Sequence, residues 1–338
     1  MKPTNFAHYI SFFLRQYLSN ERGYSDNTIK SYRDSFLLLL SFLRDQKGIK
    51  LEKITLEILD KNLILEFLDW LTNVRKCSSS SRNTRLAALH SFFKYLSREE
   101  LSYLDRCQSI LSITTKKSAK DTINYMSPEA VKLILSMPNL ESKKGRRDLA
   151  LLSLIYDTGG RVQEIIDLTP SMINLEKPFS VKLFGKGKKI RLVPVLDAQI
   201  YHLKNYMKEN GLLNHNVNVH PLFYNNRNEK LTRAGINYIV KIYVSKARKI
   251  EPSIFPKTVS CHTFRHSKAM HLLLSGVNLV YIRDILGHSS VITTEMYAKV
   301  DSKQKREALE KAYINLTPTE SKANWENNPT LIDWLKSF

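Results

Sequence analysis

Three short stretches in the second half of the chain carry side chains that can bind a phosphate group and exchange protons near it. In TGGRVQE, two glycines precede Arg161 and predict a guanidinium at a helix N-terminus, where free N–H groups favour an anion. In CHTFRH, His262 and Arg265 are three residues apart, so a helix would stack them on one face. In the third stretch, LGH ends at His288, and Tyr297 follows nine residues later.

Together with Lys186 in the GKGKK turn, these side chains suit cleavage of a phosphodiester without a metal ion. An arginine holds phosphate with two parallel hydrogen bonds, and a histidine exchanges a proton near neutral pH. A tyrosine phenolate forms a covalent phosphoester that retains the energy of the bond, and a hairpin-tip lysine can protonate the departing sugar oxygen. No Asp/Glu cluster has the spacing of Mg²⁺ ligands, so we expect no metal and no cofactor, and a two-metal nuclease is disfavoured.

Each stretch taken alone also has a structural interpretation. Glycine and arginine open many helices, and CHTFRH can be a capped basic helix. A single tyrosine is more often a core residue whose hydroxyl is hydrogen-bonded, and this chain has 16 tyrosines. The chemical interpretation therefore depends on all the stretches occurring together and in this order.

The charge of the chain indicates an acidic partner. It carries 52 Lys and Arg against 32 Asp and Glu, a formal net charge of +20. Residues 1–115 hold 17 basic and 12 acidic residues, whereas residues 116–338 hold 35 and 20. Nucleic acid is the first candidate and a membrane surface the second, although any one basic cluster can be a solvated helix face. Four clusters favour phosphate binding, and they lie within 116–120, 143–147, 186–191 and 241–268.

Length and composition exclude several classes of protein. With 338 residues and 43% hydrophobic content, the chain is long enough for two domains, each with its own core, and is not disordered throughout. Its longest apolar runs are too short to cross a bilayer, and the N-terminus lacks the layout of a secretion signal. Three widely separated cysteines predict neither a disulfide framework nor a Cys zinc site, which fits the cytoplasm.

Hydrophobic periodicity predicts a mainly α fold with a small β-hairpin. Residues 1–112 indicate a helical domain, residues 113–126 a basic linker and residues 127–317 a mixed α/β domain, followed by a tail at 318–338. In the first domain, helices are expected over the apolar stripe 6–18, from Ser25 or Asp26, over roughly 56–74, and from the Ser78 to Ser81 turn. Strand-forming residues within 179–195 flank the hairpin turn. Further helices are expected at about 128–136, 146–157, from 161, 197–210, 232–249, 263–275, 279–285, 290–297 and 302–313.

The motifs resemble those of the tyrosine recombinases, also called phage-type integrases, over nearly the whole chain. TGGRVQEIIDL (158–168) resembles the box of the first arginine, GKGKKIRLVPV (185–195) the lysine hairpin, and HTFRHSKAMHLLLSG (262–276) the His-x-x-Arg box. LGHSSVITTEMY (286–297) is similar to the box of the second histidine and the nucleophile. RGYSDNTIKSYRDSF (22–36) and SRNTRLAALHSFFKYL (81–96) resemble the helical core-binding domain. One departure is Gly160, where a bulky apolar residue is usual.

The resemblance implies a DNA-cutting reaction with a role for each matched residue. Tyr297 would attack a DNA phosphate to form a 3′-phosphotyrosyl link, with Arg161, Arg265 and His288 binding that phosphate. His262 would help to remove the tyrosine proton, Lys186 would protonate the leaving 5′-oxygen, and Glu164 would support the site. The implied partner is double-stranded DNA with specific recombination sites. Further contacts to DNA are expected from Arg82, Arg85, Lys116, Lys117, Lys120, Lys188 and Lys189.

The resemblance also implies an assembly, while leaving alternatives open. The family exchanges strands through a Holliday junction as a DNA-bound tetramer built from dimers on each site, and the tail would dock on its own domain or on a neighbouring protomer. Integration, excision or transposition of a mobile element is our first expectation. Resolution of chromosome dimers is the alternative role. A type IB topoisomerase shares the catalytic residue types, and a non-enzymatic DNA-binding regulator is the third interpretation.

Overall fold

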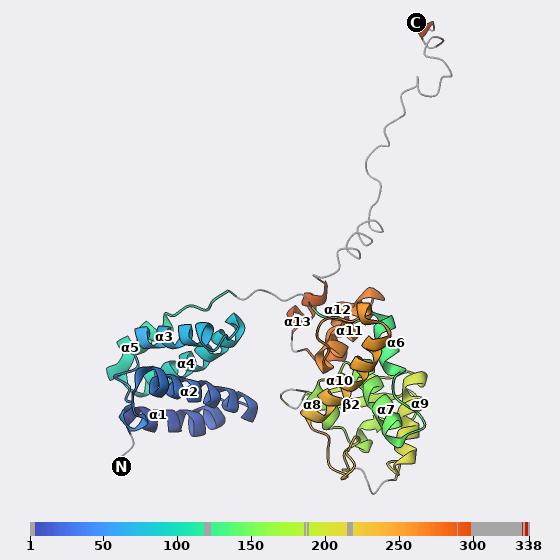
Figure 1. Cartoon of the computed structure of the whole chain (residues 1–338), viewed down its shortest axis with the longest axis horizontal. Coiled ribbons are helices and arrows are strands. Elements are labelled where there is room, and N and C mark those ends of the chain that lie inside the picture. Colours follow the sequence, from blue (N-terminus) through green and yellow to red (C-terminus); the bar gives the residue numbers. More distant parts are fainter. Residues whose placement is uncertain are drawn as a thin grey trace. The chain divides into compact units, whose positions relative to one another are not determined.

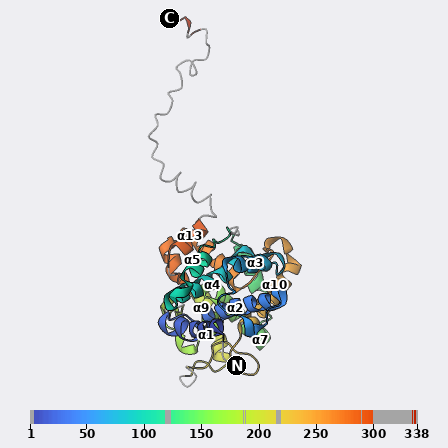
Figure 2. The same ribbon diagram turned by 90° about the vertical axis from the view of Figure 1, so that its left-hand side faces the viewer.

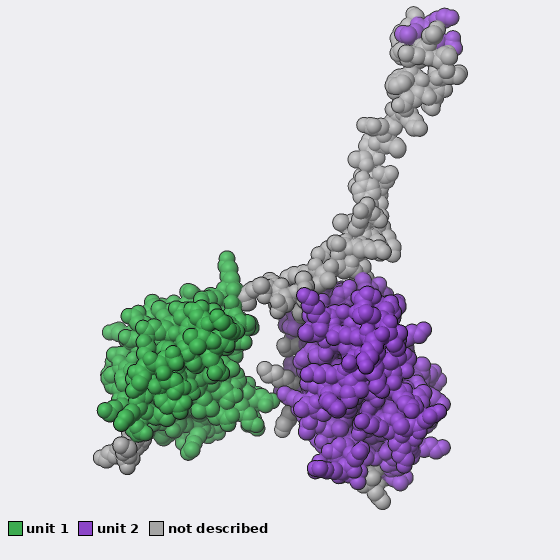
Figure 3. Space-filling model, in the orientation of Figure 1, with its two compact units in different colours: residues 1–121 green, residues 122–338 purple. Residues whose placement is uncertain are grey.

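The chain folds into two compact units, residues 1–121 and residues 122–338 (Figure 3). The computed structural model describes residues 4–117, 123–185, 187, 189–214, 219–288, 290–298, 333, 335 and 336. The predicted helix at 302–313, nearly all of the tail, and residues 118–122 of the predicted linker lie outside the described residues. In the part of the chain that is described, no helix is long and apolar enough to cross a bilayer.

The first unit is a bundle of helices (blue to teal in Figures 1 and 2). A π-helical stretch over Phe13–Glu21 continues the first helix, and short 3₁₀ turns cover Leu51–Lys53 and Leu101–Tyr103. Its α-helices are α1 (Asn5–Phe12), α2 (Asp26–Lys47), α3 (Lys61–Asn73), α4 (Ser79–Glu99) and α5 (Leu104–Leu111).

Side-chain caps fix where these helices begin. The side chains of Thr4, Asp60 and Ser78 each accept a hydrogen bond from a backbone N–H in the first turn of α1, α3 and α4. The third helix therefore begins at Lys61 rather than near residue 56 as predicted, because Asp60 caps it. The structure adds α5, which sequence analysis did not predict as a helix; its Cys107 and Ile110 are buried.

An aromatic cluster forms much of the core of the first unit. Phe13 is fully buried, and its ring lies 5.3 Å from that of Phe92 and 6.2 Å from that of Phe36, in edge-to-face contacts. Tyr17 and Tyr95 extend the cluster with ring centroids 4.8 Å apart. Such offset and edge-to-face pairs add to the stabilisation from apolar burial, so the π-helical stretch Phe13–Glu21, α2 and α4 are joined at one centre.

The second unit combines eight helices among its described residues with a small antiparallel sheet (Figure 1). The strands β1 (Ile173–Asn174), β2 (Ser180–Phe184) and β3 (Ile190–Pro194) lie in that order, and Phe184 pairs with Ile190 beside the turn. The helices are α6 (Pro128–Leu135), α7 (Lys143–Thr158), α8 (Val162–Ile166), α9 (Asp197–Glu209), α10 (Arg233–Ile250), α11 (Cys261–Leu274), α12 (Leu279–Leu286) and α13 (Ile292–Ala298).

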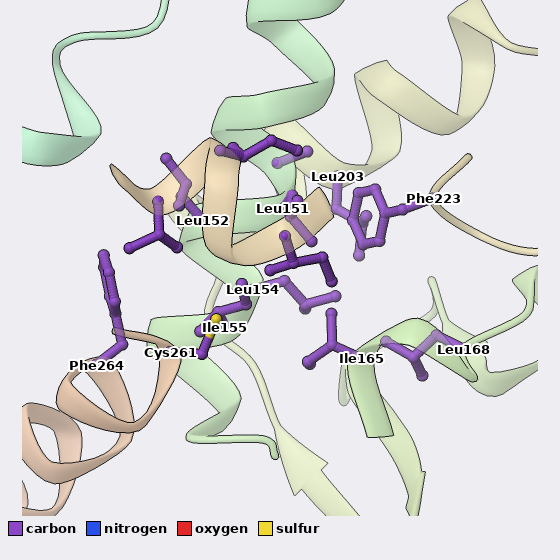
Figure 4. Packing of buried hydrophobic residues seen from close by; sticks show 14 of the residues in the cluster. Leu151, Leu152, Leu154, Ile155, Ile165, Leu168, Leu203, Phe223, Cys261 and Phe264 are labelled. Atoms are coloured by element: carbon purple, nitrogen blue, oxygen red, sulfur yellow. The ribbon is translucent and has the colours of Figure 1, made fainter. Parts of the chain in front are cut away.

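The core of this unit lies around α7. Leu151 and Ile155 from α7 are fully buried and pack with Ile165 from α8 and Phe264 from α11 (Figure 4). A second, smaller cluster lies among α11, α12 and α13 and is made of Ala269, Met270, Leu273, Ile282, Leu286 and Tyr297. The predicted fold class, mainly helical with a small hairpin sheet, is confirmed. The helix expected from residue 161 is short, since α8 ends at Ile166.

Candidate active site

Arg265 is buried at the centre of the site. It lies on the first turns of α11 with 4% of its surface exposed. One guanidinium nitrogen donates to the backbone oxygen of Gly159 at 2.6 Å, and the other donates to that of Leu286 at 2.7 Å. Burial, followed by the charges of Arg161 and Arg191, lowers the pKa of Arg265 to about 10. Arg265 therefore stays charged at neutral pH while joining the ends of α7 and α12.

Glu164 is a buried carboxylate shared by two arginines. Arg191 donates to both of its oxygens, at 3.0 and 2.6 Å, and Arg161 donates to Oε1 at 2.9 Å. The backbone N–H of Arg161 also donates to Oε2 at 2.8 Å. Burial alone would raise the pKa of Glu164, but the hydrogen bonds and charge of Arg191, with the hydrogen bonds from Arg161, lower that pKa below its usual value. Glu164 thus holds Arg161 in a fixed orientation.

A basic cavity of about 490 Å³ opens beside this network. The backbone of Gly185 and of Gly287 forms part of its wall. Gly287 has a φ of +66°, and a Cβ there would lie 2.8 Å from a guanidinium nitrogen of Arg191, so only glycine fits without a shift. Cations outnumber acids in the lining, which suits an anion; the charged and titratable side chains are Arg161, Lys189, Arg191, Arg283, Asp284 and His288.

The two predicted histidines both lie close enough to Arg265 to feel its charge. His262 is exposed, one turn before Arg265, and its pKa is lowered by partial desolvation and by Arg265 and Arg161. His288 lines the cavity, and its Nδ1 lies 2.9 Å from the Thr294 hydroxyl. Burial first, and then the charges of Arg265 and Arg161, lower the pKa of His288 to about 4. Both imidazoles are therefore neutral in the free protein at pH 7.

Tyr297 lies next to these groups but is covered. On α13 it is 1% exposed, and it is absent from the cavity lining. Its ring is nearly parallel to that of His288, at 9° and 6.5 Å. Its hydroxyl lies 2.9 Å from Nδ1 of His266. Burial raises the pKa of Tyr297, and Arg265 offsets part of that rise, so the phenol is protonated.

Two residues of the site were not singled out from the sequence. Arg191 fixes Glu164 and donates to the backbone oxygen of Ile285 at 2.9 Å, while His266 contacts Tyr297. His266 could have been suspected because it stands four residues after His262, on the same side of a helix. Arg191 gives no such signal, because its partner Glu164 lies 27 residues away in sequence.

The predicted residues fall into three groups. Arg161, Glu164, His262, Arg265, His288 and Tyr297 come together in the second unit, and Lys189 lines their cavity. In the first unit, Arg82 and Lys116 line another cavity and Lys117 is exposed. There, Arg85 joins α4 to α2 through the Ser31 carbonyl and the Ser35 hydroxyl. Lys120, Lys186 and Lys188 lie outside the described residues.

Comparison with protein families identifies both units. The model of the Phage integrase family matches residues 124–304, more than half of the chain. The chain belongs to this family. The phage integrase N-terminal SAM-like domain matches residues 12–100. The resemblance to tyrosine recombinases drawn from the motifs is confirmed.

Individual relatives agree with the family. The chain is 34% identical over 301 residues to the putative integrase/recombinase y4rC of Sinorhizobium fredii, covering 89% of each protein. It is 34% identical to tyrosine recombinase XerD of Staphylococcus epidermidis, covering 86% of this chain and 93% of that one. The phage integrase family member described here is therefore a site-specific DNA recombinase of the tyrosine type.

Solved structures show the same fold. The XerH site-specific recombinase bound to palindromic difH substrate, in a post-cleavage complex, is similar with a TM-score of 0.65 and 22% identity, over 83% of this chain and 79% of that chain. The Tn1549 transposon integrase in complex with a circular intermediate DNA is similar with a TM-score of 0.69 and 16% identity, over 92% and 100%. At these identities the likeness concerns the fold.

Proposed function

We propose that this recombinase cuts and rejoins DNA through a 3′-phosphotyrosyl intermediate on Tyr297, in the integration, excision or transposition of a mobile element. The observation that carries the proposal is that Arg161 and His288 line one basic cavity, that the charge of Arg265 acts on His288, and that the ring of Tyr297 stacks with that of His288. A catalytic centre without a metal must stabilise the negative charge of the phosphorane-like transition state with such hydrogen-bond donors. The similarity to the putative integrase/recombinase y4rC supports integration as one of these reactions.

The chemistry assigned to these residues balances in two steps. The oxygen of Tyr297 attacks phosphorus and its proton passes to His262, while the bond to the 5′-oxygen breaks and Lys186 supplies that oxygen with a proton. Arg161, Arg265 and His288 stabilise the charge on the phosphate oxygens. A 5′-hydroxyl of a second duplex then attacks the phosphotyrosine and passes its proton to Lys186, while the bond from phosphorus to the Tyr297 oxygen breaks and His262 returns a proton to that oxygen. Repeated on the other strands, this exchange passes through a Holliday junction.

The buried position of Tyr297 implies a movement before cleavage. Its hydroxyl is bonded to His266 and its ring lies in the cluster of α11 to α13, so it does not reach the cavity in the structure. Attack requires the reacting atoms to be within about 3–3.5 Å of each other. Binding of DNA must therefore release Tyr297 from this cluster and bring it to the phosphate.

We further propose that the protein acts in the cytoplasm on double-stranded DNA carrying specific recombination sites, as a dimer on each site and a tetramer in the synapse. Accessory proteins are not part of the proposal. The second candidate role is resolution of chromosome dimers, favoured by 34% identity to tyrosine recombinase XerD. Sequencing the DNA covalently trapped on the protein in its host distinguishes the two, because a mobile element and a chromosomal resolution site yield different flanking sequences.

The nucleophile is tested with Tyr297→Phe on a nicked suicide substrate. We expect the variant to bind the site with unchanged affinity and to form no covalent adduct, because the phenyl ring has no oxygen to attack phosphorus. Adducts are counted by denaturing electrophoresis, and binding is measured by gel shift on the same DNA. Tyr281→Phe, an exposed tyrosine of α12, is the matched control and should form adducts like the wild type. An adduct in Tyr297→Phe would place the nucleophile elsewhere.

A further inference from the structure

Three successive backbone oxygens at the C-terminal end of α12 each accept a hydrogen bond from a different arginine. The pairs are Arg191 to Ile285 at 2.9 Å, Arg265 to Leu286 at 2.7 Å and Arg161 to Gly287 at 3.2 Å. The last carbonyl groups of a helix have no partner within the helix, and the negative end of its dipole favours cations. His288 follows directly in the chain, so the three arginines fix the segment that carries it.

All three guanidinium nitrogens of Arg191 donate within the protein. Besides the oxygen of Ile285, they bind both carboxylate oxygens of Glu164, at 3.0 and 2.6 Å, and only 10% of the Arg191 side chain is exposed. The side chain of Arg161, which shares Glu164, is 34% exposed. Both arginines line the cavity, but Arg161 is the one with more surface free to meet a phosphate.

The cluster of Arg161, Glu164 and Arg191 holds two positive charges and one negative charge. Burial raises the pKa of Glu164, but the hydrogen bonds and charge of Arg191 lower that pKa more than the hydrogen bonds from Arg161 do. Arg191 is therefore the main counter-ion of this buried carboxylate, which would otherwise be costly to bury. With Glu164 neutralised by Arg191, the charge of Arg161 stays available to an anion in the cavity.

Arg191 also joins the hairpin of β2 and β3, whose turn includes Lys186, to the rest of the site. A Cβ on Gly185, the residue before Lys186, would lie 3.5 Å from Oε1 of Glu164 and 3.6 Å from a guanidinium nitrogen of Arg191. The base of the turn therefore lies beside this ion pair. Because Arg191 is itself part of β3, its bonds to Glu164 and Ile285 connect the hairpin to α8 and to the end of α12.

We propose that Arg191 is a positioning residue for the cleavage step: it keeps the charge of Arg161 available to the scissile phosphate and holds His288 and the lysine hairpin beside it. It acts through its hydrogen bonds and does not touch the phosphate. Without Arg191, Glu164 pairs with Arg161 alone and cancels its charge, and the oxygen of Ile285 loses its donor. The proposal rests on the proposed function, in which Arg161 and His288 bind that phosphate.

The effect on charge is tested by single-turnover cleavage of the nicked suicide substrate at saturating protein. Arg191→Met should slow adduct formation by up to about 100-fold, because the groups around the phosphate lose alignment and charge. Adding Glu164→Gln should recover much of the rate, since no carboxylate then cancels the charge of Arg161. Arg191→Lys, which restores a charge without the three-way geometry, should be intermediate. A double variant as slow as Arg191→Met would refute the charge effect.

Tyr206→Phe is the control for a general loss of stability. The Tyr206 hydroxyl is buried in the same unit and donates to the backbone oxygen of Leu222 at 2.9 Å, and this residue is not among the described residues that line the cavity. Its variant should melt below the wild type, as Arg191→Met should, yet cleave at the wild-type rate. Equal slowing in both would refute the positioning role. If Arg191→Met does not fold, Arg191→Gln, whose amide still donates hydrogen bonds, replaces it.

The contact with α12 is tested by hydrogen–deuterium exchange on the full chain without DNA. The backbone N–H of His288 donates to the oxygen of Arg283 at 3.0 Å, so exchange in peptides covering 283–288 reports on the end of this helix. Arg191→Met should speed exchange there more than Tyr206→Phe does, because the helix end loses a side-chain partner. Exchange at the wild-type rate in Arg191→Met would show that Arg191 does not hold the segment before His288.

The outcomes distinguish this proposal from the proposed function. If the wild type forms no covalent adduct, the proposed function is wrong, while exchange at 283–288 still decides whether Arg191 holds this segment. If the wild type forms adducts and Arg191→Met forms them at the same rate, the proposed function stands and the positioning role of Arg191 is wrong.

Discussion

One hydrogen bond, between Tyr297 and His266, helps to set the position of the proposed nucleophile. The phenol is fully buried and its hydroxyl is satisfied by a neutral imidazole, whose pKa is lowered by burial and then by His262 and Arg265. A buried hydroxyl that loses its partner costs about 1–3 kcal/mol. The hydrogen bond therefore stabilises the position in which Tyr297, the proposed nucleophile, lies outside the cavity. Breaking this bond adds to the free-energy cost of cleavage unless contacts with DNA compensate for it.

The coupling between these two residues is measurable. His266→Leu should lower the free energy of unfolding by about 1–3 kcal/mol, because it leaves the Tyr297 hydroxyl buried without an acceptor. In the Tyr297→Phe background the same substitution should cost less, since no hydroxyl remains to be satisfied. Urea unfolding of the wild type, both single variants and the double variant gives the coupling energy. Additive effects of the two substitutions would show that the contact contributes nothing.

The histidines with lowered pKa values predict a loss of stability in acid. The folded protein lowers the pKa of His288 to about 4, whereas an unfolded histidine has a pKa of about 6.5. The unfolded state therefore binds more protons between these values, and the free energy of unfolding falls as the pH falls from about 6.5 to about 4, by less than about 1.4 kcal/mol per pH unit for this residue. His288→Gln should flatten this dependence in urea unfolding at several pH values. His262, His266 and His271 also have lowered pKa values, so part of the slope should remain. Equal slopes in the variant and the wild type would contradict the assignment.

At the level of elements, the turn between α7 and α8 decides where Arg161 lies. Gly159 ends α7 in a left-handed conformation, and the next glycine brings the chain close to α8. A Cβ on Gly160 would lie 2.8 Å from Cδ1 of Ile165 and 3.1 Å from the Thr158 hydroxyl. The bulky residue usual in tyrosine recombinases therefore does not fit this turn as it is packed here.

Gly160→Leu tests this packing. We expect it to lower the free energy of unfolding by about 1–3 kcal/mol or more, because the new side chain displaces Ile165 in the core beside Arg161. Gly235→Ala on α10 is the matched control, since its Cβ would come no closer than 3.4 Å to the Thr232 hydroxyl. That control should be neutral or stabilising by about 0.5–1 kcal/mol. Thermal or urea unfolding checks both, and a stable Gly160→Leu would show that the turn relaxes easily.

Over the whole molecule, two units with separate cores each present a basic cavity. The cavity of the second unit is lined by residues from the start of α8, the hairpin strand β3, α12 and the segment after it, and Arg265 of α11 bonds to the end of α12. The net charge of +20 supports binding to a polyanion over an extended surface. The proposed assembly of several protomers on DNA is also a property of the whole molecule.

Truncation before Pro318 tests the assembly. The removed segment contains the apolar residues Trp325, Leu331, Trp334 and Leu335, which suit docking on a protein surface. We expect the truncated protein to bind a single site and to form fewer tetramers on paired sites, because a contact between protomers is lost. Mass photometry of the protein on one-site and two-site DNA measures both states. Unchanged tetramer formation would show that the tail makes no contact that the tetramer needs.

The sequence by itself determined the family and the fold class, and it supplied the residues of the proposed catalytic set, because these depend on short motifs and local periodicity. Helix starts such as Ser127-Pro128 were predictable, since a cap is a contact between near neighbours in the chain. The helix α5 was missed, because its few apolar residues form no long stripe. Only the tertiary structure decided that Arg191 shares Glu164, that the Tyr297 hydroxyl contacts His266, and that Arg82 is buried with no carboxylate of the described residues in an ion pair with it. These facts depend on side chains brought together from distant parts of the chain, and on which of them water can reach.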